Sequence, residues 1–180
     1  ASEGSIDILV NNAGTTRYRA FDSITDADWD AVLALDLKAV FYCAQAAAPH
    51  MTRQGCGKIV NISSSLGTGT TPHVGALGPG AASPYASAKA GVIQLTQILA
   101  RELGPSGINV NCIAPGFFLT DANAPFFSQP RLVELARRIP LQRFGRPDEL
   151  VGVAIFLASD AASYITGQVL TVDAGLSIAL

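Results

Sequence analysis

The chain has 180 residues, 49% of them hydrophobic and only 14% charged, so it is long enough to bury one sizeable core and too apolar to be disordered. Its formal net charge of −2 offers no basic surface for nucleic acid, and no run of about 18 apolar residues predicts a membrane span. Nothing resembles a signal peptide. We therefore expect one domain over residues 1–180, located in the cytoplasm, with neither nucleic acid nor membrane as a partner.

The three cysteines, Cys43, Cys56 and Cys112, are an odd number without metal-ligand spacing. Reduced thiols in a cytoplasmic protein are therefore expected rather than disulfides or a metal site. Cys43 falls in an apolar helix and Cys112 in a strand, which predicts that both thiols fill space in the core.

The first half of the chain alternates predicted strands with a long helix. Residues 6–12 and 58–63 are short apolar runs with polar ends, a pattern that predicts two strands. Between them, residues 26–53 predict a helix with acidic residues in its first turn. The stretch over 67–84 is rich in Gly, Thr and Pro and has no regular pattern.

The second half continues the alternation. The expected elements are a helix over 84–103, a strand over 108–114 that ends in a Pro-Gly turn, a long segment over 117–145 with an amphipathic piece at 130–139, a helix over 147–159 and a last strand over 168–172. Alternating strands and helices predict an α/β fold with a parallel sheet. Ligands bind beyond the carboxyl ends of such strands, so the polar strand ends should line one crevice.

Tyr85 and Lys89 stand four residues apart in a predicted helix, which places the phenol and the ammonium on one face. A phenol with a pKa near ~10 is a poor acid or base at neutral pH, and a nearby ammonium favours its ionised form. Lowering that pKa by about three units requires ~4 kcal/mol, much of which one close cation in a half-buried cleft can supply. The spacing alone more often marks an exposed Tyr and a solvated Lys, so other segments must decide.

Four further motifs supply that context. They are Asn-Asn-Ala-Gly at 11–14, a serine before Tyr-x-x-x-Lys, Pro-Gly at 115–116 followed by Thr120, and the late run at 165–175. In this order the motifs resemble the short-chain dehydrogenase/reductase family over essentially the whole chain. The resemblance implies a Rossmann-like, doubly wound parallel sheet, of which this chain holds the C-terminal portion, about four strands with flanking helices.

One feature of that family is missing from the sequence. Its members begin with a strand, a glycine-rich turn and a helix whose amino terminus holds the cofactor pyrophosphate, and no such unit occurs here. By resemblance the chain starts at the family's fourth strand, and we interpret it as a fragment that is inactive alone. Residues after the family's second strand normally choose between the two cofactors, so NAD and NADP both stay open.

The resemblance assigns roles to three side chains. Tyr85 would act as the acid or base for the substrate hydroxyl, and Lys89 would lower its pKa and hydrogen-bond the nicotinamide ribose. Ser64, three residues before Gly67, would hold the substrate oxygen. A hydroxyl that merely ends a strand is the competing interpretation, and the neighbouring serines at 63 and 65 make Ser64 a choice among three.

Asp36 occupies a position where the family usually has an asparagine that kinks the long helix and binds a water of a proton relay. A carboxylate there could accept the same hydrogen bond and hold Lys89 more tightly, but it would also oppose a tyrosinate. The usual proton path is therefore in doubt in this chain.

The resemblance also implies two groups of cofactor contacts. Those near the adenosine ribose would be Asn12, Ala13 and Gly14; those around the nicotinamide would be Pro115, Gly116, Phe118 and Thr120, together with Tyr85 and Lys89. The asparagines at 11 and 12 could instead be ordinary turn residues.

The substrate class rests on three short runs. Residues 115–123, residues 143–147 and the Asp-Leu pair at 36–37 resemble the gluconate 5-dehydrogenase group, which implies a small hydroxy or keto substrate such as a sugar acid or polyol. Arg17, Arg19 or Arg143 could bind its carboxylate, although each is more often a surface residue. The alternatives are a 3-oxoacyl-carrier-protein reductase and a non-catalytic remnant.

Assembly follows from the same resemblance. In this family the helices that correspond to 26–53 and 84–103 pair with their symmetry mates, and the end of the chain at 176–180 often forms a second interface. A homotetramer or homodimer is expected. Without the first half of the fold, the strand at 6–12 should become a sheet edge with exposed apolar surface.

Overall fold

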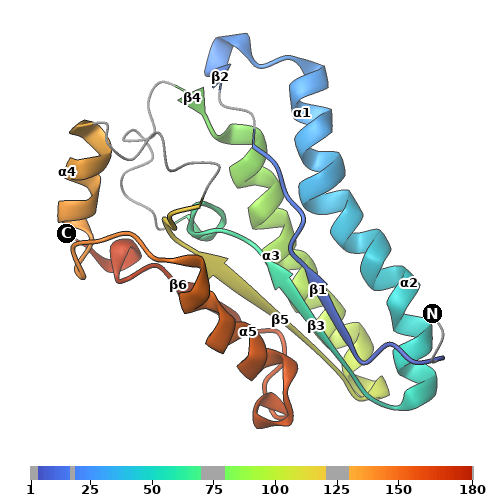
Figure 1. Cartoon of the computed structure of the whole chain (residues 1–180). Helices are drawn as coiled ribbons and strands as arrows, with labels where there is room; N and C mark the ends of the chain where they lie inside the picture. The colour runs from blue at the N-terminus through green and yellow to red at the C-terminus, as the bar shows by residue number, and fades with distance from the viewer. Residues whose placement is uncertain (1–3, 17–18, 70–79, 121–129, 180) are drawn as a thin grey trace.

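The centre of the molecule is a parallel sheet of four strands (Figure 1). The structure is a computed structural model that describes residues 4–16, 19–69, 80–120 and 130–179. The sheet has the order β1-β3-β5-β6, and its strands are β1 (Ile8–Asn11), β3 (Gly57–Ile62), β5 (Ile108–Pro115) and β6 (Val169–Val172). All four strands expected from the sequence are confirmed, as is the α/β fold.

Helices cover both faces of this sheet, as a doubly wound fold requires. Helices α2 (Ala39–Gln54) and α3 (Ser83–Leu103) lie on one face, and α5 (Val151–Ala158) lies on the other (Figure 1). Because successive residues of a strand point to opposite faces, Ile59 packs with Met51 and Leu99 on the first side, whereas Val60 packs with Leu157 on the second.

The long helix predicted over 26–53 is continuous but not uniform. It consists of α1 (Asp26–Leu33), a π-helical turn η2 (Ala34–Lys38) and α2. Thr25 caps it, because its hydroxyl accepts the backbone N–H of Asp28 while the Asp28 carboxylate accepts the N–H of Thr25. The extent of the helix was predicted correctly, and the π turn was not predicted.

The same helix is apolar enough to pass a composition test for a membrane span. The 29 residues Asp26–Gln54 contain a window with a mean hydropathy of 1.4. One such helix is weak evidence, because the core helix of a soluble protein passes the same test. Here Val40, Ala44, Ala47 and Met51 are buried within the protein.

The remaining helical elements are the long helix α3 and several short segments. Helix α3 begins with Pro84 in its first turn, as predicted. The helix expected over 147–159 begins as a 3-10 turn, η7 (Pro147–Leu150), and continues as α5. The other described elements are η1 (Phe21–Ser23), η3 (Ser65–Thr68), η5 (Gly104–Ser106), α4 (Pro130–Arg138), η8 (Asp160–Ala162) and η9 (Leu176–Ile178).

A second, two-stranded sheet was not predicted. Strand β2 (Arg19–Ala20) pairs antiparallel with β4 (Gly80–Ala81). Each strand is only two residues long, too short for a periodic pattern in the sequence. The pairing holds the segment after β1 beside the residues that lead into α3.

Strand β1 lies at the edge of the main sheet, as the sequence analysis expected. Ile8 and Val10 are 50% and 47% exposed, and on α5 Val151 and Ile155 are 52% and 62% exposed. Apolar surface is therefore open on the face of the sheet that α5 covers only in part.

The predictions for the cysteines are confirmed in part. All three thiols are free, and Cys112 is buried in β5 as expected. Burial raises the pKa of the Cys112 thiol to about 11, so this residue is a neutral core side chain. The core assignment of Cys43 is wrong, because its side chain is exposed on α2.

Candidate active site

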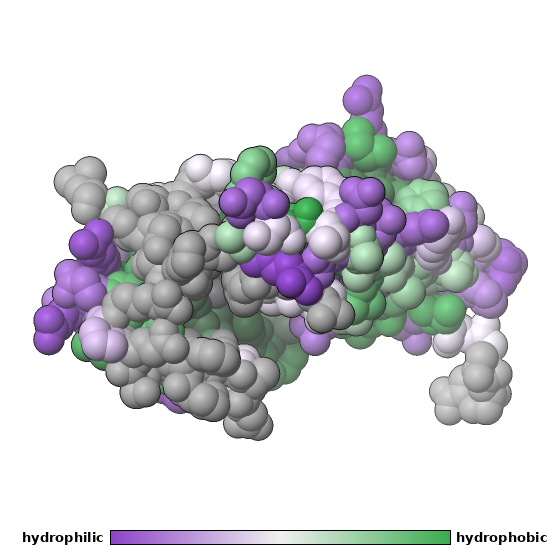
Figure 2. Space-filling view, turned by 90° about the horizontal axis from the view of Figure 1, so that it is seen from above, coloured by the Kyte–Doolittle hydropathy of each residue, from purple (hydrophilic) through white to green (hydrophobic). Residues whose placement is uncertain are grey.

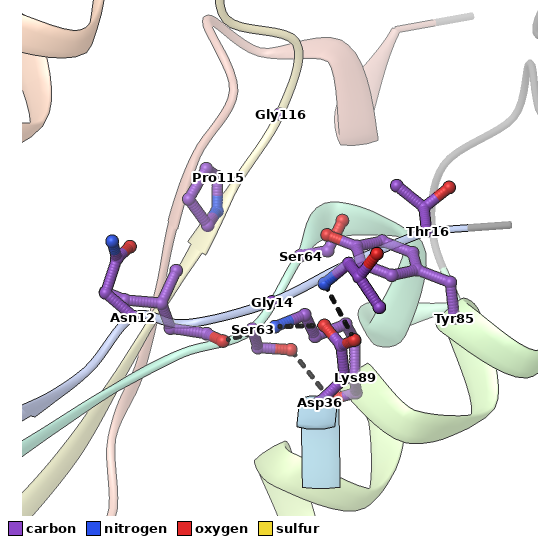
Figure 3. Close-up of a pocket in the computed structure, with 12 residues that line it drawn as sticks. Asn12, Gly14, Thr16, Asp36, Ser63, Ser64, Tyr85, Lys89, Pro115 and Gly116 are labelled. Atoms are coloured by element: carbon purple, nitrogen blue, oxygen red, sulfur yellow. Dashed lines mark hydrogen bonds and ion pairs between the residues drawn. The ribbon is translucent and has the colours of Figure 1, made fainter. Parts of the chain in front are cut away.

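A cavity of about 270 Å³ lies at the carboxyl ends of β1, β3 and β5 (Figure 3). Figure 2 looks onto this end of the molecule and shows hydrophilic and hydrophobic residues side by side over its described surface. The cavity is lined by Asn12, Gly14, Thr15, Thr16, Asp36, Ile62, Ser63, Ser64, Tyr85, Lys89, Pro115 and Gly116. The structure thus brings together the polar strand ends that were expected to meet.

Tyr85 and Lys89 lie one turn apart on α3 and both face the cavity. The Lys89 Nζ is 5.5 Å from the centroid of the Tyr85 ring. Lys89 is only 3% exposed, and Figure 3 shows the Tyr85 ring directed toward Ser64. A phenol and a buried cation therefore face the same small volume, in which electrostatic interactions are stronger than in water.

The Lys89 ammonium is held by two acceptors. It donates to the backbone carbonyl of Ile62 at 3.0 Å and lies 3.1 Å from Oδ1 of Asp36, whose side chain is fully buried. Removing one partner of a buried ion pair leaves the other charge uncompensated, at a cost of about 3–5 kcal/mol. The pair is therefore a structural constraint on this end of the sheet.

Asp36 reaches the cavity from the π-helical turn η2. Its Oδ2 accepts the backbone N–H of Thr15 at 2.9 Å, which connects the long helix to the loop after β1. Single π turns inside α-helices often occur at functional sites. The sequence analysis found the residue but not the turn, because no residue pattern distinguishes five π-helical residues from α-helix.

The three serines after β3 have different environments. Ser64 lines the cavity, and its hydroxyl accepts the Leu66 N–H at 3.2 Å at the start of η3. Ser63 also borders the cavity, but its hydroxyl donates to the Lys89 carbonyl at 2.7 Å. Ser65 is buried outside the cavity lining. Ser64 is therefore the best placed of the three to contact a substrate oxygen.

Gly67 explains how the end of β3 reaches α3. A Cβ at this position would lie 2.7 to 2.9 Å from backbone atoms of Lys89 and Ala90. Only glycine permits this approach, which keeps Ser64 close to Tyr85.

The loop after β1 contributes more than the predicted residues. Asn12 and Gly14 line the cavity as the resemblance implied, whereas Ala13 is exposed and lies outside the lining. Thr15 and Thr16 also line it and were not predicted. Their position directly after Asn-Asn-Ala-Gly was the available signal.

A buried polar network lies beneath the cavity. Asn11 donates to the Oδ1 of Asn61 at 2.8 Å, and Asn61 donates to the hydroxyl of Thr96 on α3 at 2.9 Å. Buried amides must be hydrogen-bonded, so this network specifies how β1, β3 and α3 align. The strand-end asparagine at position 11 is therefore a sheet residue rather than a cavity residue.

Two predicted cofactor contacts lie elsewhere. Phe118 packs against Gly145 and lines a second cavity of about 110 Å³, together with Phe117 and Arg143. Thr120 is exposed and lines neither cavity. Pro115 and Gly116 are the residues of this segment that reach the first cavity.

The arginines considered for a substrate carboxylate already have carboxylate partners. Arg143 binds Glu149 with two hydrogen bonds of 2.7 Å, and Arg19 lies 2.8 Å from Asp28. Arg17 lies outside the described residues. Hydrogen bonds from Arg143 and from the backbone N–H of Arg146 lower the pKa of Glu149 from 4.5 to about 2.

This shift predicts a pH dependence of stability. A carboxylate whose pKa is lower in the folded than in the unfolded state stabilises the fold at pH values above its unfolded pKa. This stabilisation is lost as the pH falls through the folded-state pKa. Glu149→Gln should therefore lower the midpoint temperature of thermal unfolding at pH 7. The difference in midpoint between the variant and the unmodified protein should disappear as the pH falls from 4.5 to about 2. Calorimetry measures the unfolding midpoints, and Glu134→Gln on α4 is the control. A gap that does not change with pH would contradict the assignment.

The comparisons with known proteins agree with this geometry. A family model described as enoyl-(acyl carrier protein) reductase matches residues 1–177. The chain belongs to the short-chain dehydrogenase/reductase family. Proteins of this family are oxidoreductases that use NAD or NADP, and they share the Rossmann-like parallel sheet described above.

The relatives carry two kinds of name. The 3-oxoacyl-(acyl-carrier-protein) reductase of Thermotoga maritima is 45% identical over 175 residues, which are 97% of this chain and 68% of the relative. That of Staphylococcus aureus is 43% identical over 173 residues, 96% of this chain and 67% of the relative. A solved gluconate 5-dehydrogenase of Burkholderia cenocepacia, in complex with NADP and tartrate, is 40% identical with a TM-score of 0.88, over 98% of this chain and 66% of that one.

Proposed function

We propose that this protein interconverts a secondary alcohol and a ketone with NAD or NADP, using Ser64, Tyr85 and Lys89. The main support is one arrangement: a nearly fully buried ammonium beside the Tyr85 ring, which faces Ser64 in a cavity at the strand ends. A secondary alcohol loses its proton and its hydride to different acceptors, so such a site needs an acid or base placed apart from the hydride acceptor.

Each side chain has a distinct task in this proposal. When bound, the nicotinamide accepts or returns the hydride. Tyr85 takes the proton of the substrate hydroxyl in oxidation and gives it back in reduction. Ser64 donates a hydrogen bond to the substrate oxygen and stabilises the charge that develops on it. Lys89 holds the local geometry and supplies positive charge near the phenol.

The cavity residues fit a nicotinamide riboside. Lys89 has three N–H groups, of which one donates to the Ile62 carbonyl while the ammonium forms an ion pair with Asp36, so a donor remains for a ribose hydroxyl. A Cβ at Gly116 would lie 2.6 Å from Asp173, which shows how closely the backbone passes there. Pro115 supplies an apolar wall, and Asn12 and Gly14 border the cavity on the β1 side.

The role of Tyr85 can be tested by removing its hydroxyl. In the longest form of the protein that its gene encodes, Tyr85→Phe should lower turnover by at least ~10²-fold, the lower range for a general acid or base. Cofactor binding should be largely retained, because the ring remains in place. Steady-state kinetics and dinucleotide titration measure the two effects. Unchanged turnover would remove Tyr85 from the mechanism.

For the substrate we favour a sugar acid or polyol, as in gluconate 5-dehydrogenases. The support is the likeness to solved proteins of that name, together with the Asp-Leu pair at 36–37. The second candidate is a 3-oxoacyl-carrier-protein reductase, because the most similar sequence relatives reported above carry that name. Rates of gluconate oxidation and of 3-oxoacyl thioester reduction, measured on one preparation, discriminate between them.

The alternative to an enzyme is a non-catalytic remnant of one. The sequence contains no unit of strand, glycine-rich turn and helix that could bind a pyrophosphate. We therefore propose that the 180-residue chain alone binds a dinucleotide only weakly. Calorimetric titration with NAD and with NADP should show no micromolar affinity, and hydrophobic dyes should bind at the open apolar surface of β1 and α5. Micromolar binding would show that the cavity residues suffice without that unit.

We propose a cytoplasmic homodimer or homotetramer. On α2 and α3, Phe41, Tyr42 and Ile98 are 39 to 52% exposed. Beside Phe41 a groove of about 560 Å³ runs between the two helices, lined also by Ala44, Ala48, Pro49 and Leu99. A second copy would cover this apolar surface.

Light scattering at micromolar concentration should therefore show a dimer or tetramer. Ala48→Glu places a charge in the groove and should shift the protein toward monomer. Ala161→Glu, at an exposed position in η8 away from α2 and α3, is the control and should leave the mass unchanged. A monomeric unmodified protein would count against the proposal.

A further inference from the structure

A carboxylate at position 36 fits its surroundings better than an amide would. Two donors face this side chain: the Thr15 N–H at 2.9 Å from Oδ2 and the Lys89 ammonium at 3.1 Å from Oδ1. A carboxylate offers an acceptor to each, whereas an amide has one acceptor oxygen and would turn its NH₂ toward the other donor. Local geometry therefore favours an aspartate over an asparagine at this position.

The contact with Lys89 is an ion pair more than a hydrogen bond. Among the described residues, Oδ1 of Asp36 has no partner with hydrogen-bond geometry, although the ammonium lies 3.1 Å away. Both side chains are almost fully buried, at 0% and 4% exposure. Burial weakens solvent screening, so the interaction between these charges extends to other groups at the cavity.

In the described part of the chain, the charged and titratable groups at or near the cavity come from three elements. Helix α3 contributes Lys89 and the titratable Tyr85, and η2 contributes Asp36. Cys112 on β5 also feels the Lys89 charge but is neutral, because burial raises the pKa of its thiol to about 11. The described lining residues from β1, β3 and the Pro-Gly turn carry no charge. Among the residues that the structure describes, the cavity lining therefore carries one positive and one negative charge near the phenol.

We infer that Asp36 is a positioning residue that neutralises Lys89, so that Tyr85 keeps its proton at neutral pH and the site is set to donate a proton to a ketone. This inference rests on the proposed function. In a ketone reduction, bound reduced nicotinamide would supply the hydride to the carbonyl carbon, and the Tyr85 hydroxyl would give its proton to the carbonyl oxygen. A proton from water would then restore the Tyr85 hydroxyl. With an uncharged residue at 36, the full charge of Lys89 would favour the phenolate and hence alcohol oxidation at lower pH.

Asp36 also fixes the loop that would border the cofactor. A Cβ at Gly14 would lie 2.7 Å from Oδ1 of Asp36 and 3.4 Å from Nζ of Lys89, so only glycine leaves room for the pair. Together with the Thr15 N–H, this contact couples the ion pair to the end of β1. Neutralising position 36 should therefore also raise KM for the dinucleotide.

The test is a spectroscopic titration of Tyr85 that needs no turnover. Phenolate absorbance of the full-length protein minus that of its Tyr85→Phe variant isolates one of the chain's four tyrosines. We expect Tyr85 in the unmodified protein to ionise within about one pH unit of ~10, the value for free tyrosine. Ionisation below about pH 8 would overturn the inference whether or not any variant folds.

The matched comparison uses Asp36→Asn and, as a control, Asp30→Asn at an exposed position on α1 of the same continuous helix. Asp36→Asn should move the Tyr85 titration down by about one pH unit or more, and the control should not move it. Circular dichroism verifies folding. A folded Asp36→Asn protein with an unchanged Tyr85 titration would overturn the inference.

Kinetics then separate this inference from the proposed function. In an active enzyme, Asp36→Asn should retain activity and shift the pH at which oxidation is half-maximal downward by the same amount as the spectroscopic titration. A kinetic profile that stays in place while the phenolate titration moves would overturn the link to proton donation. Absence of turnover with every hydroxy and keto compound would refute the proposed function. The spectroscopic titration would still show whether Asp36 affects the ionisation of Tyr85.

Discussion

The buried ammonium of Lys89 is the constraint on which the cavity end of this molecule depends. A buried cation must be compensated, and its partners come from different parts of the chain: the Ile62 carbonyl at the end of β3 and the Asp36 carboxylate of the long helix. Asp36 in turn holds the Thr15 N–H after β1. Satisfying one charge thus fixes two strand ends and two helices relative to each other.

The parallel sheet makes this convergence possible. Because β1, β3 and β5 run in the same direction, their carboxyl ends meet at one edge, and α3 begins at that edge after β3. Ser63 and Gly67 bring the end of β3 into contact with the backbone of α3 at Lys89. The distance between Ser64 and Tyr85 is therefore set by strand-to-helix packing and not by the long segment that separates them in sequence.

Periodic features of the sequence were sufficient for most of the fold and for the centre of the site. Apolar runs and caps located the strands and helices, and the four-residue spacing of Tyr85 and Lys89 placed both on one face of α3. Contacts without a local pattern could not be predicted: the pairing of β2 with β4, and the π turn at Asp36. The position of Phe118 could not be predicted for the same reason, because it packs against Gly145, a residue 27 positions away in the sequence.

Asp36 shows why a departure from a family pattern must be interpreted through its neighbours. Taken from the sequence alone, it places a charge where the resemblance implies an amide, and this charge would oppose a tyrosinate. In the structure that charge has two donors, one of which is the cation that would otherwise stabilise the tyrosinate. The same Tyr-x-x-x-Lys spacing can therefore serve a proton donor or a proton acceptor at neutral pH, depending on a side chain about fifty residues earlier in the chain.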